Sequence, residues 1–266
     1  MKFARFSIDP QTAPTAPDSA PGVRWGLLEG EQIRQITGEV FGQWIATERL
    51  YSPAAVRLLP PCAPSKIVCI GRNYRDHAAE LNNPVPKEPL LFLKPPSSLI
   101  ASGDTILCPA QSQRVDYEGE LGMVIGRRCR KVDDLDAALE HVFGYTCVND
   151  VTARDLQKQD VQFTRGKGFD TFCAVGPCLA PREEAAAGEA AVRTWLDGVL
   201  KQDGNTRDLI FPLGALICYI SQVMTLEPGD LIATGTPAGV GPMQPGSVVR
   251  VEVEGVGRLE NPVGRG

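Results

Sequence analysis

The chain has 266 residues, of which 43% are hydrophobic and 22% are charged, and its formal net charge is −5. This length and apolar content are typical of one large domain, or one domain with a small appendage, and exclude a largely disordered protein. The mild negative charge excludes nucleic acid and anionic membranes as expected partners, and no apolar run approaches the ~20 residues that cross a bilayer.

The first segment, up to residue 60, predicts a small β-rich unit. Its N-terminus lacks the apolar core of a signal peptide, so a cytoplasmic location is expected. Residues 23–36 predict a β-hairpin, and residues 41–50 predict a short helix. The proline-rich stretch 59–64 then predicts an extended linker, which ends the unit at 1–60.

Beyond the linker, short apolar runs separated by Gly and Pro predict a series of strands. They cover residues 66–70, 90–94, 115–125, 144–149, 230–234, 247–253 and 258–261. Helical spacing of apolar residues predicts a helix over 135–142, between a cap at Asp133 or Asp134 and Gly144, and another over 212–224. A regular βαβ alternation is missing, so the pattern favours a β-rich α+β fold with few helices and a twisted or rolled sheet.

One predicted strand carries a row of acids. If residues 114–126 form a strand, Asp116, Glu118 and Glu120 share one face and lie roughly 7 Å apart along it. A solvated outer face is the alternative, but Gly119 between the two glutamates is typical of a position that a ligand or another backbone approaches closely. Asp150, at the end of the next apolar run, adds a third acid.

Glu118, Glu120 and Asp150 together offer a hard set of oxygen ligands. The chain has eight cysteines without a Cys-x-x-Cys pair and only two histidines, so neither disulfides nor a zinc site of the usual spacing is expected. The three carboxylates would suit Mg²⁺ or Mn²⁺, with Ca²⁺ as a further candidate.

Three further segments carry candidate polar groups. A short helix from Arg75 would place His77 and Glu80 on one face, where the carboxylate orients the imidazole as a base; the alternative is a surface His–Glu pair. Lys167 lies between two glycines that allow close approach to a ligand, although a solvated loop lysine is the alternative. The glycine-rich turn 234–241 lacks a phosphate-loop ending and predicts a carboxylate-binding turn that presents Thr236 and backbone N–H groups.

Six strings in order resemble the fumarylacetoacetate hydrolase family, in particular its short branch of acylpyruvases and enzymes like 2-hydroxyhepta-2,4-diene-1,7-dioate isomerase. The resemblance covers about residues 64–264, the expected catalytic domain. The strings are Gly71-Arg72-Asn73-Tyr74 with His77, Phe92-Leu93-Lys94-Pro95, Asp116-Tyr117-Glu118-Gly119-Glu120-Leu121, Asn149-Asp150-Val151-Thr152-Ala153-Arg154-Asp155, Gly166-Lys167-Gly168-Phe169-Asp170-Thr171-Phe172, and Leu226-Glu227-Pro228-Gly229-Asp230 through Gly241.

The resemblance implies a mixed β-roll, usually a homodimer, and a site that binds Mg²⁺ or Mn²⁺ through the three carboxylates. It implies that His77 and Glu80 form a catalytic dyad, assisted by Lys167. It also implies substrate contacts from Arg72, Tyr74, Arg154, Gln157 and Thr236. The aspartate that gives the long eukaryotic hydrolase a further metal ligand is not matched, because Arg72-Asn73 occupies that region.

The leading hypothesis is hydrolysis of a C–C bond in an acylpyruvate. The metal and Lys167 would stabilise the departing enolate, and His77 would deprotonate the attacking water. The same residues would also serve an isomerase or tautomerase of 2-hydroxymuconate-type diacids, or an oxaloacetate decarboxylase. A non-catalytic metal-binding protein is the alternative from another class. The expected partner is therefore a small 2-oxo acid or dicarboxylate.

Overall fold

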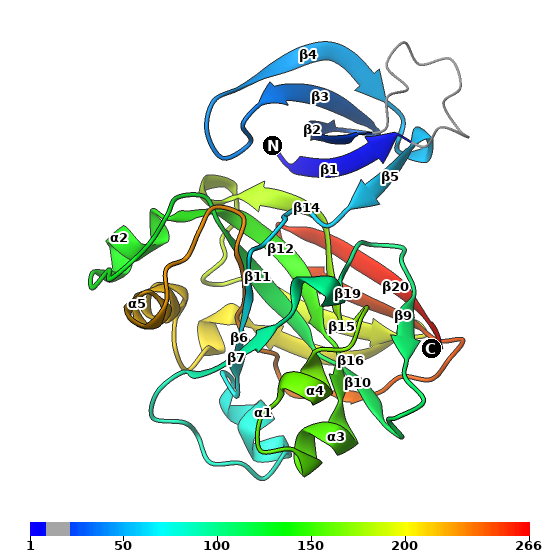
Figure 1. Ribbon diagram of the computed structural model, residues 1–266, viewed down its shortest axis with the longest axis vertical. Coiled ribbons are helices and arrows are strands. Elements are labelled where there is room, and N and C mark those ends of the chain that lie inside the picture. Colours follow the sequence, from blue (N-terminus) through cyan, green and yellow to red (C-terminus); the bar gives the residue numbers. More distant parts are fainter. Residues whose placement is uncertain (9–21) are drawn as a thin grey trace.

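The computed structural model describes residues 1–8 and 22–266, so residues 9–21 of the expected N-terminal unit lie outside the described part. The chain folds into three β-sheets with a few short helices, which confirms the expected β-rich α+β class (Figure 1). None of the helices in the described ranges is long and apolar enough to cross a membrane.

The largest sheet has twelve strands and runs from the N-terminal strands into the body of the molecule (Figure 1). Its order is β4-β3-β2-β1-β14-β12-β11-β17-β6-β7, with β5 paired to β1 and β8 paired to β14. The strands are β1 (Phe3–Ile8), β2 (Val23–Glu29), β3 (Gln32–Gly38), β4 (Trp44–Tyr51), β5 (Val56–Leu59), β6 (Ile67–Gly71), β7 (Leu90–Lys94), β8 (Leu99–Ile100), β11 (Gly119–Ile125), β12 (Val142–Asp150), β14 (Cys173–Pro181) and β17 (Leu231–Ala233).

Two smaller sheets complete the fold. One has the order β16-β15-β19-β20-β9 and the other the order β13-β10-β18. Their strands are β9 (Ile106–Cys108), β10 (Val115–Tyr117), β13 (Thr152–Ala153), β15 (Ala191–Leu196), β16 (Val199–Asn205), β18 (Gly241–Pro242), β19 (Val248–Val253) and β20 (Gly257–Arg265). The predicted hairpin and the predicted strands beyond the linker are thus confirmed with shifted ends, except that the strand expected over 115–125 is divided between β10 and β11.

The helices lie at the margins of the sheets (Figure 1). They are α1 (Arg75–Glu80), α2 (Leu135–Leu139), α3 (Arg154–Gln159), α4 (Thr164–Lys167) and α5 (Leu213–Val223), with short 3₁₀ turns at Pro53–Ala55, Pro96–Ser98, Arg182–Glu184 and Thr206–Asp208. The helix expected over 212–224 is confirmed as α5. The helix expected over 135–142 begins after its cap at Asp134 but ends at Leu139, because Val142 and Gly144 already belong to β12.

The short helix expected over 41–50 is wrong, because this segment forms the edge strand β4. It pairs with β3, as between Ile33 and Tyr51. Trp44, Ile45 and Thr47 are aromatic or β-branched residues that suit a pleated surface, and pairing with β3 satisfies one side of the backbone. Pairing with a neighbouring strand therefore decides the conformation of this segment.

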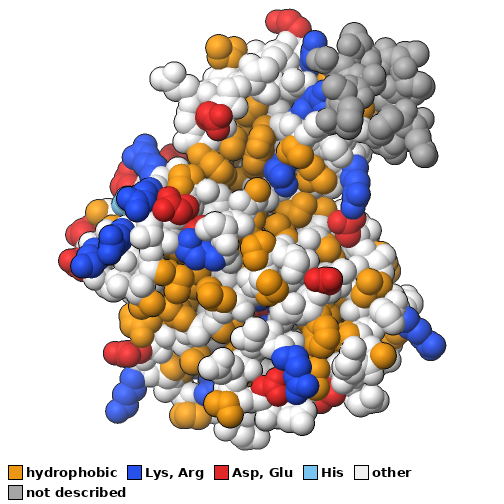
Figure 2. Space-filling model, in the orientation of Figure 1, with side chains coloured by type: hydrophobic (Ala, Val, Ile, Leu, Met, Phe, Trp, Pro, Cys, Tyr) orange, Lys and Arg blue, Asp and Glu red, His pale blue; other side chains and the backbone are white. Residues whose placement is uncertain are grey.

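The main core lies between the large sheet and the five-stranded sheet. Leu121 and Met123 of β11 belong to the same buried cluster as Val251 and Val253 of β19, and α5 packs against that cluster. A second cluster joins the N-terminal strands to β12 and β14. Figure 2 shows hydrophobic side chains gathered on the surface between these N-terminal strands and the body.

The predicted acidic strand is interrupted where the acids occur. Val115–Tyr117 forms β10, which pairs with β13 and β18, whereas β11 begins at Gly119 and pairs with β12 and β17. Glu118 lies at the junction. Both faces of this segment are buried, so the alternative of a solvated acidic face is wrong.

Candidate active site

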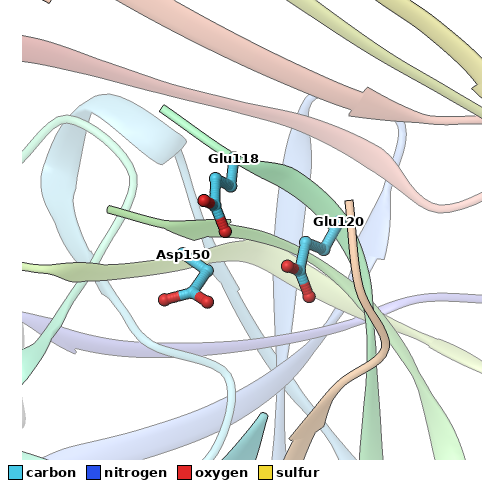
Figure 3. Close-up of side chains that lie close together, drawn as sticks. All are labelled: Glu118, Glu120 and Asp150. Atoms are coloured by element: carbon cyan, nitrogen blue, oxygen red, sulfur yellow. The ribbon is translucent and has the colours of Figure 1, made fainter. Parts of the chain in front are cut away.

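Three buried carboxylates meet where β11 and β12 pair. Glu118, Glu120 and Asp150 each place one oxygen within 4.8 Å of the others, and each side chain is almost fully buried. Pairing of Gly119 with Asn149 brings the three acids together, and the Asp150 backbone N–H donates to the Glu118 carbonyl at 2.9 Å. Figure 3 shows the carboxylates lying close together. The structure thus assembles the three acids that the sequence analysis selected.

Two buried lysines and a buried arginine contact this cluster. Lys167 Nζ donates to Glu118 Oε2 at 2.7 Å and to Asp150 Oδ2 at 2.6 Å. Lys94 Nζ donates to Asp150 Oδ1 and, at 3.0 Å, to the Val151 carbonyl. The Arg154 guanidinium bonds Glu118. Sequence reasoning missed Lys94, although it ends β7 within the quoted Phe-Leu-Lys-Pro string.

Glu118 and Glu120 differ in electrostatic environment. Burial raises the pKa of Glu118, but Lys167 and Arg154 outweigh this and hold it well below its usual range. Burial, reinforced by Asp150 and Glu118, raises the pKa of Glu120 well above its usual range. Glu120 accepts a bond from the Gly235 N–H at 2.8 Å, and no lysine or arginine of the described chain bonds it.

This donor set fits a divalent cation. Carboxylate oxygens are the ligands that Mg²⁺, Mn²⁺ and Ca²⁺ prefer, and no cysteine or histidine belongs to the cluster. Ionisation of a buried carboxylate without a cationic partner costs free energy. Of the three acids, Glu120 is the one whose ionised form has no lysine or arginine of the described chain bonded to it, so a bound cation would stabilise it most. Glu118, Glu120 and Asp150 are therefore the residues that could hold the ion.

A cavity of about 340 Å³ opens beside the cluster, a size that suits a small organic acid. Of the residues that the sequence analysis selected, its lining includes Arg72, His77, Glu118, Arg154, Gln157, Lys167 and Thr236. Tyr74 lies outside this lining. It is buried at the start of α1, and its hydroxyl has no hydrogen-bond partner within the described residues.

His77 is a buried imidazole in the wall of this cavity. Its Nδ1 lies 3.3 Å from Glu80 Oε2, and Glu80 in turn accepts from the Gly239 N–H at 3.1 and 3.2 Å. If Nδ1–H donates to the Glu80 carboxylate, the lone pair of Nε2 is left free. Burial lowers the pKa of His77, against the opposing effects of Glu118 and Glu80, so the ring is neutral near neutral pH and able to accept a proton.

Two arginines give the cavity a cationic wall. Arg154 donates to Asp116 Oδ2 at 2.9 Å and to Gln157 Oε1 at 2.6 Å, which fixes the guanidinium. Arg72 has a left-handed backbone, with φ of 58°, an uncommon conformation for a residue with a side chain. No ion pair involves Arg72 within the described residues, so its charge is available to an anionic ligand.

Gly119 allows the five-stranded sheet to approach the acids. A Cβ atom at this position would lie 2.0 Å from Thr194 Oγ1 and 3.2 Å from Val251 Cγ1. We therefore expect Gly119→Ala to destabilise the protein by about 1–3 kcal/mol, as overpacking of a core does, and to weaken metal binding. Urea unfolding and calorimetric titration with Mn²⁺ measure the two effects.

Gly188→Ala is the matched control, because no atom lies within 4 Å of its added Cβ and its φ is not positive. It should leave stability unchanged or slightly raised. Equal stability and equal Mn²⁺ affinity in both variants would contradict the close packing at Gly119.

The chain matches two family models. Residues 66–264 match the model described as fumarylacetoacetate (FAA) hydrolase C-terminal, and residues 1–61 match one described as Rv2993c-like, N-terminal. Among curated proteins, it is 45% identical to Protein Rv2993c of Mycobacterium tuberculosis, over 93% of this chain and 96% of that protein. It is 42% identical to oxaloacetate tautomerase YisK of Bacillus subtilis, over 81% and 75%.

Solved structures resemble the whole chain. The 2-hydroxyhepta-2,4-diene-1,7-dioate isomerase from Mycobacterium marinum is 41% identical, with a TM-score of 0.87 and coverage of 100% of this chain and 98% of that one. The maleylpyruvate hydrolase from Sphingobium sp. SYK-6, in complex with manganese(II) and pyruvate, is 30% identical, with a TM-score of 0.80 and full coverage of both chains. The expected β-roll type is therefore confirmed.

Proposed function

Since the chain belongs to the fumarylacetoacetate hydrolase family of enzymes, we propose that it moves a proton next to the keto group of a small 2-oxo dicarboxylic acid, as a metal-dependent tautomerase or isomerase. One observation carries the proposal: a neutral, buried imidazole shares a small cavity with several cationic side chains. Such a cavity attracts a dianion and offers it one base. The tautomerase and isomerase names of relatives at 41–42% identity support this choice.

We propose that Glu118, Glu120 and Asp150 hold a divalent ion. When bound, such an ion supplies electrostatic stabilisation of the negative charge that develops on the substrate. The manganese(II) in the maleylpyruvate hydrolase structure supports this assignment. Lys167, fixed between Glu118 and Asp150, adds a permanent positive charge at the edge of the cavity.

The other residues bind the substrate and move the proton. Arg154 keeps two N–H groups beyond its three bonds, and with Gln157 it binds one carboxylate. Arg72 binds the second. His77 Nε2 takes the proton from the carbon beside the keto group, and the electron pair of that C–H bond becomes the C=C bond of the enolate. Glu80 orients the ring. The same proton, delivered to oxygen or to carbon, gives the enol or the keto form.

The test is the rate at which the protein converts the enol of oxaloacetate to the keto form, followed by ultraviolet absorbance with Mg²⁺ or Mn²⁺. We expect catalysis that a chelator abolishes and that is faster than pyruvate release from any acylpyruvate. Failure to accelerate the conversion for oxaloacetate and for a 2-hydroxymuconate-type diacid would refute the proposal.

Hydrolysis of an acylpyruvate is the second candidate function, favoured by the likeness to the maleylpyruvate hydrolase. In that reaction His77 would take its proton from water instead of carbon. Metal-dependent pyruvate release would establish this reaction, and CO₂ release from oxaloacetate would establish a decarboxylase. Metal binding without turnover of any of these acids would leave a non-catalytic metal protein.

We also propose the division of the chain into a small unit over residues 1–60 and a catalytic domain over 64–264, a homodimeric state and a cytoplasmic location. Light scattering after size exclusion tests the homodimeric state, since a dimer has twice the 28.7 kDa mass of one chain.

A further inference from the structure

Gln202 reaches the candidate site from the five-stranded sheet. It lies on β16, its side chain is fully buried, and it belongs to none of the strings that indicated the family. Its Oε1 accepts from the Gly119 N–H at 3.0 Å. Its Nε2 donates to Thr236 Oγ1 at 2.7 Å and to the Pro237 carbonyl at 2.8 Å. One carboxamide thus joins the strand of the acids to the loop that carries Thr236.

The bonds of Gln202 form part of a closed ring. Thr236 Oγ1 donates to the Gly119 carbonyl at 2.8 Å, so Gly119, Gln202 and Thr236 are linked in a cycle of three bonds. Backbone groups fix its direction, because the Gly119 N–H is only a donor and the carbonyls of Gly119 and Pro237 are only acceptors. The amide of Gln202 therefore has one orientation, and the hydroxyl proton of Thr236 must point at Gly119.

This direction limits what Thr236 offers the cavity. Its single proton is used by the Gly119 carbonyl, so the hydroxyl can offer a ligand only an oxygen lone pair. A lone pair binds a hydroxyl or another donor and repels a carboxylate or carbonyl oxygen. A carboxylate at this turn would therefore have to bind its backbone N–H groups and not the Thr236 hydroxyl.

The same loop also supports the base. Gly239, with φ of 101°, packs against β16 so closely that a Cβ there would lie 2.1 Å from the Lys201 carbonyl oxygen. Its N–H donates to Glu80, the carboxylate that orients His77. The contact of Gln202 with Pro237 thus anchors a loop whose far end contacts the dyad.

We propose that Gln202 is the positioning residue of this site. It holds Gly119 between two of the three metal-binding acids, and it sets Thr236 as a hydrogen-bond acceptor that favours an enol hydroxyl over a keto oxygen. The second half of this statement rests on the proposed function for the identity of the ligand. The first half concerns only the acids and stands without turnover.

The experiment compares Gln202→Leu and Gln202→Glu with wild type and with Gln222→Leu, the same change at an exposed glutamine of α5. Calorimetry measures Mn²⁺ affinity, thermal unfolding measures stability without metal, and enol turnover gives kcat and KM. We expect Gln202→Leu to weaken Mn²⁺ binding about 10–100-fold, the range for residues that orient metal ligands. Gln222→Leu should bind Mn²⁺ as wild type does.

Gln202→Glu separates the two halves of the proposal. Its carboxylate still accepts from Gly119, so Mn²⁺ affinity should remain within a few-fold of wild type. As an anion it cannot donate to Thr236 Oγ1 or to the Pro237 carbonyl, so the Thr236 hydroxyl loses its fixed position and KM for the enol should rise about tenfold with less change in kcat. Because this variant keeps the size of the side chain, it also serves if Gln202→Leu does not fold. Thr236→Val should raise KM for the enol by a similar factor. Thr236→Ser, which keeps the hydroxyl, should have a KM near that of wild type.

A purely structural role predicts a lower unfolding temperature with unchanged Mn²⁺ affinity in Gln202→Leu and unchanged KM in Gln202→Glu, and that result would overturn the inference. Wild-type protein that binds Mn²⁺ without turning over any enol would instead refute the proposed function, and the affinity comparison would still decide the role of Gln202 toward the acids. Weaker Mn²⁺ binding by Gln202→Leu than by wild type would uphold that role, and equal affinity would overturn it.

Discussion

Glu120→Gln is expected to abolish divalent-metal binding and leave the metal-free protein at least as stable as wild type. Glu120 is buried, and no lysine or arginine within the described residues bonds it. The metal-free fold therefore favours its protonated form, which a glutamine closely imitates, and the new amide oxygen can still accept from Gly235. Loss of a residue that only supports a metal ligand costs about 10–100-fold in affinity, so loss of one of the three carboxylate ligands themselves should cost more than this and remove activity with it.

Glu118→Gln is the matched variant with the opposite effect on stability. Glu118 is bonded by Lys167 and Arg154, so its neutralisation leaves two buried cations with an incomplete set of partners. Breaking a buried pair in this way costs about 3–5 kcal/mol. Urea unfolding of both variants without metal, with Mn²⁺ calorimetry alongside, measures the difference. Equal destabilisation by the two substitutions would contradict the assignment of partners.

The pH dependence of stability without metal follows from Glu120. Its raised pKa means that the folded state binds a proton more tightly than the unfolded chain, whose Glu has a pKa near 4.5. This contribution to stability is therefore complete below about pH 4.5 and is lost as the pH rises toward the folded pKa. Glu120→Gln should remove this loss, so the stability of the variant relative to wild type should rise with pH in the metal-free state.

His77→Gln is expected to lower kcat about 10²–10⁴-fold, the usual contribution of a general base, with Mn²⁺ affinity unchanged. The imidazole lines the cavity and is not among the three acids that would hold the metal. His141→Gln is the control, since it alters the other histidine of the chain, which lies outside this cavity. Comparable loss of activity in both variants would exclude His77 as the base.

The pH profile adds a second test of the dyad. Burial lowers the pKa of His77 from 6.5, so the acid limb of the rate profile should lie below pH 6.5, where the ring becomes protonated and stops accepting protons. The bond to Glu80 raises that pKa, so Glu80→Gln should move the limb to still lower pH and also reduce kcat. A limb at higher pH in that variant would argue against this contact.

The acids of the site could be predicted because strand geometry is local. Alternation along one segment placed Glu118 and Glu120 on the same side, and the end of the next apolar run marked Asp150 as a third acid. The two segments are neighbours in sequence and pair directly as β11 and β12. Most of the fold followed from similar patterns of apolar runs between turns.

Two groups that support the acids could not be predicted in the same way. Lys94 and Gln202 come from separate strands, one of them in another sheet, and a lone buried lysine or glutamine has no periodicity to mark it. Recognising them requires the register between distant strands. The same is true of β4, where pairing with β3 decided the conformation of a segment predicted as a short helix.

The pairing of β11 with β12 also has a consequence for folding. This antiparallel pair joins segments that are near in sequence, and its register sets Glu118 beside Asp150. Mutual repulsion between the carboxylates opposes this pairing in the absence of a counter-charge. Refolding is therefore expected to be faster with Mn²⁺ than without it, and stopped-flow refolding at matched ionic strength measures the difference.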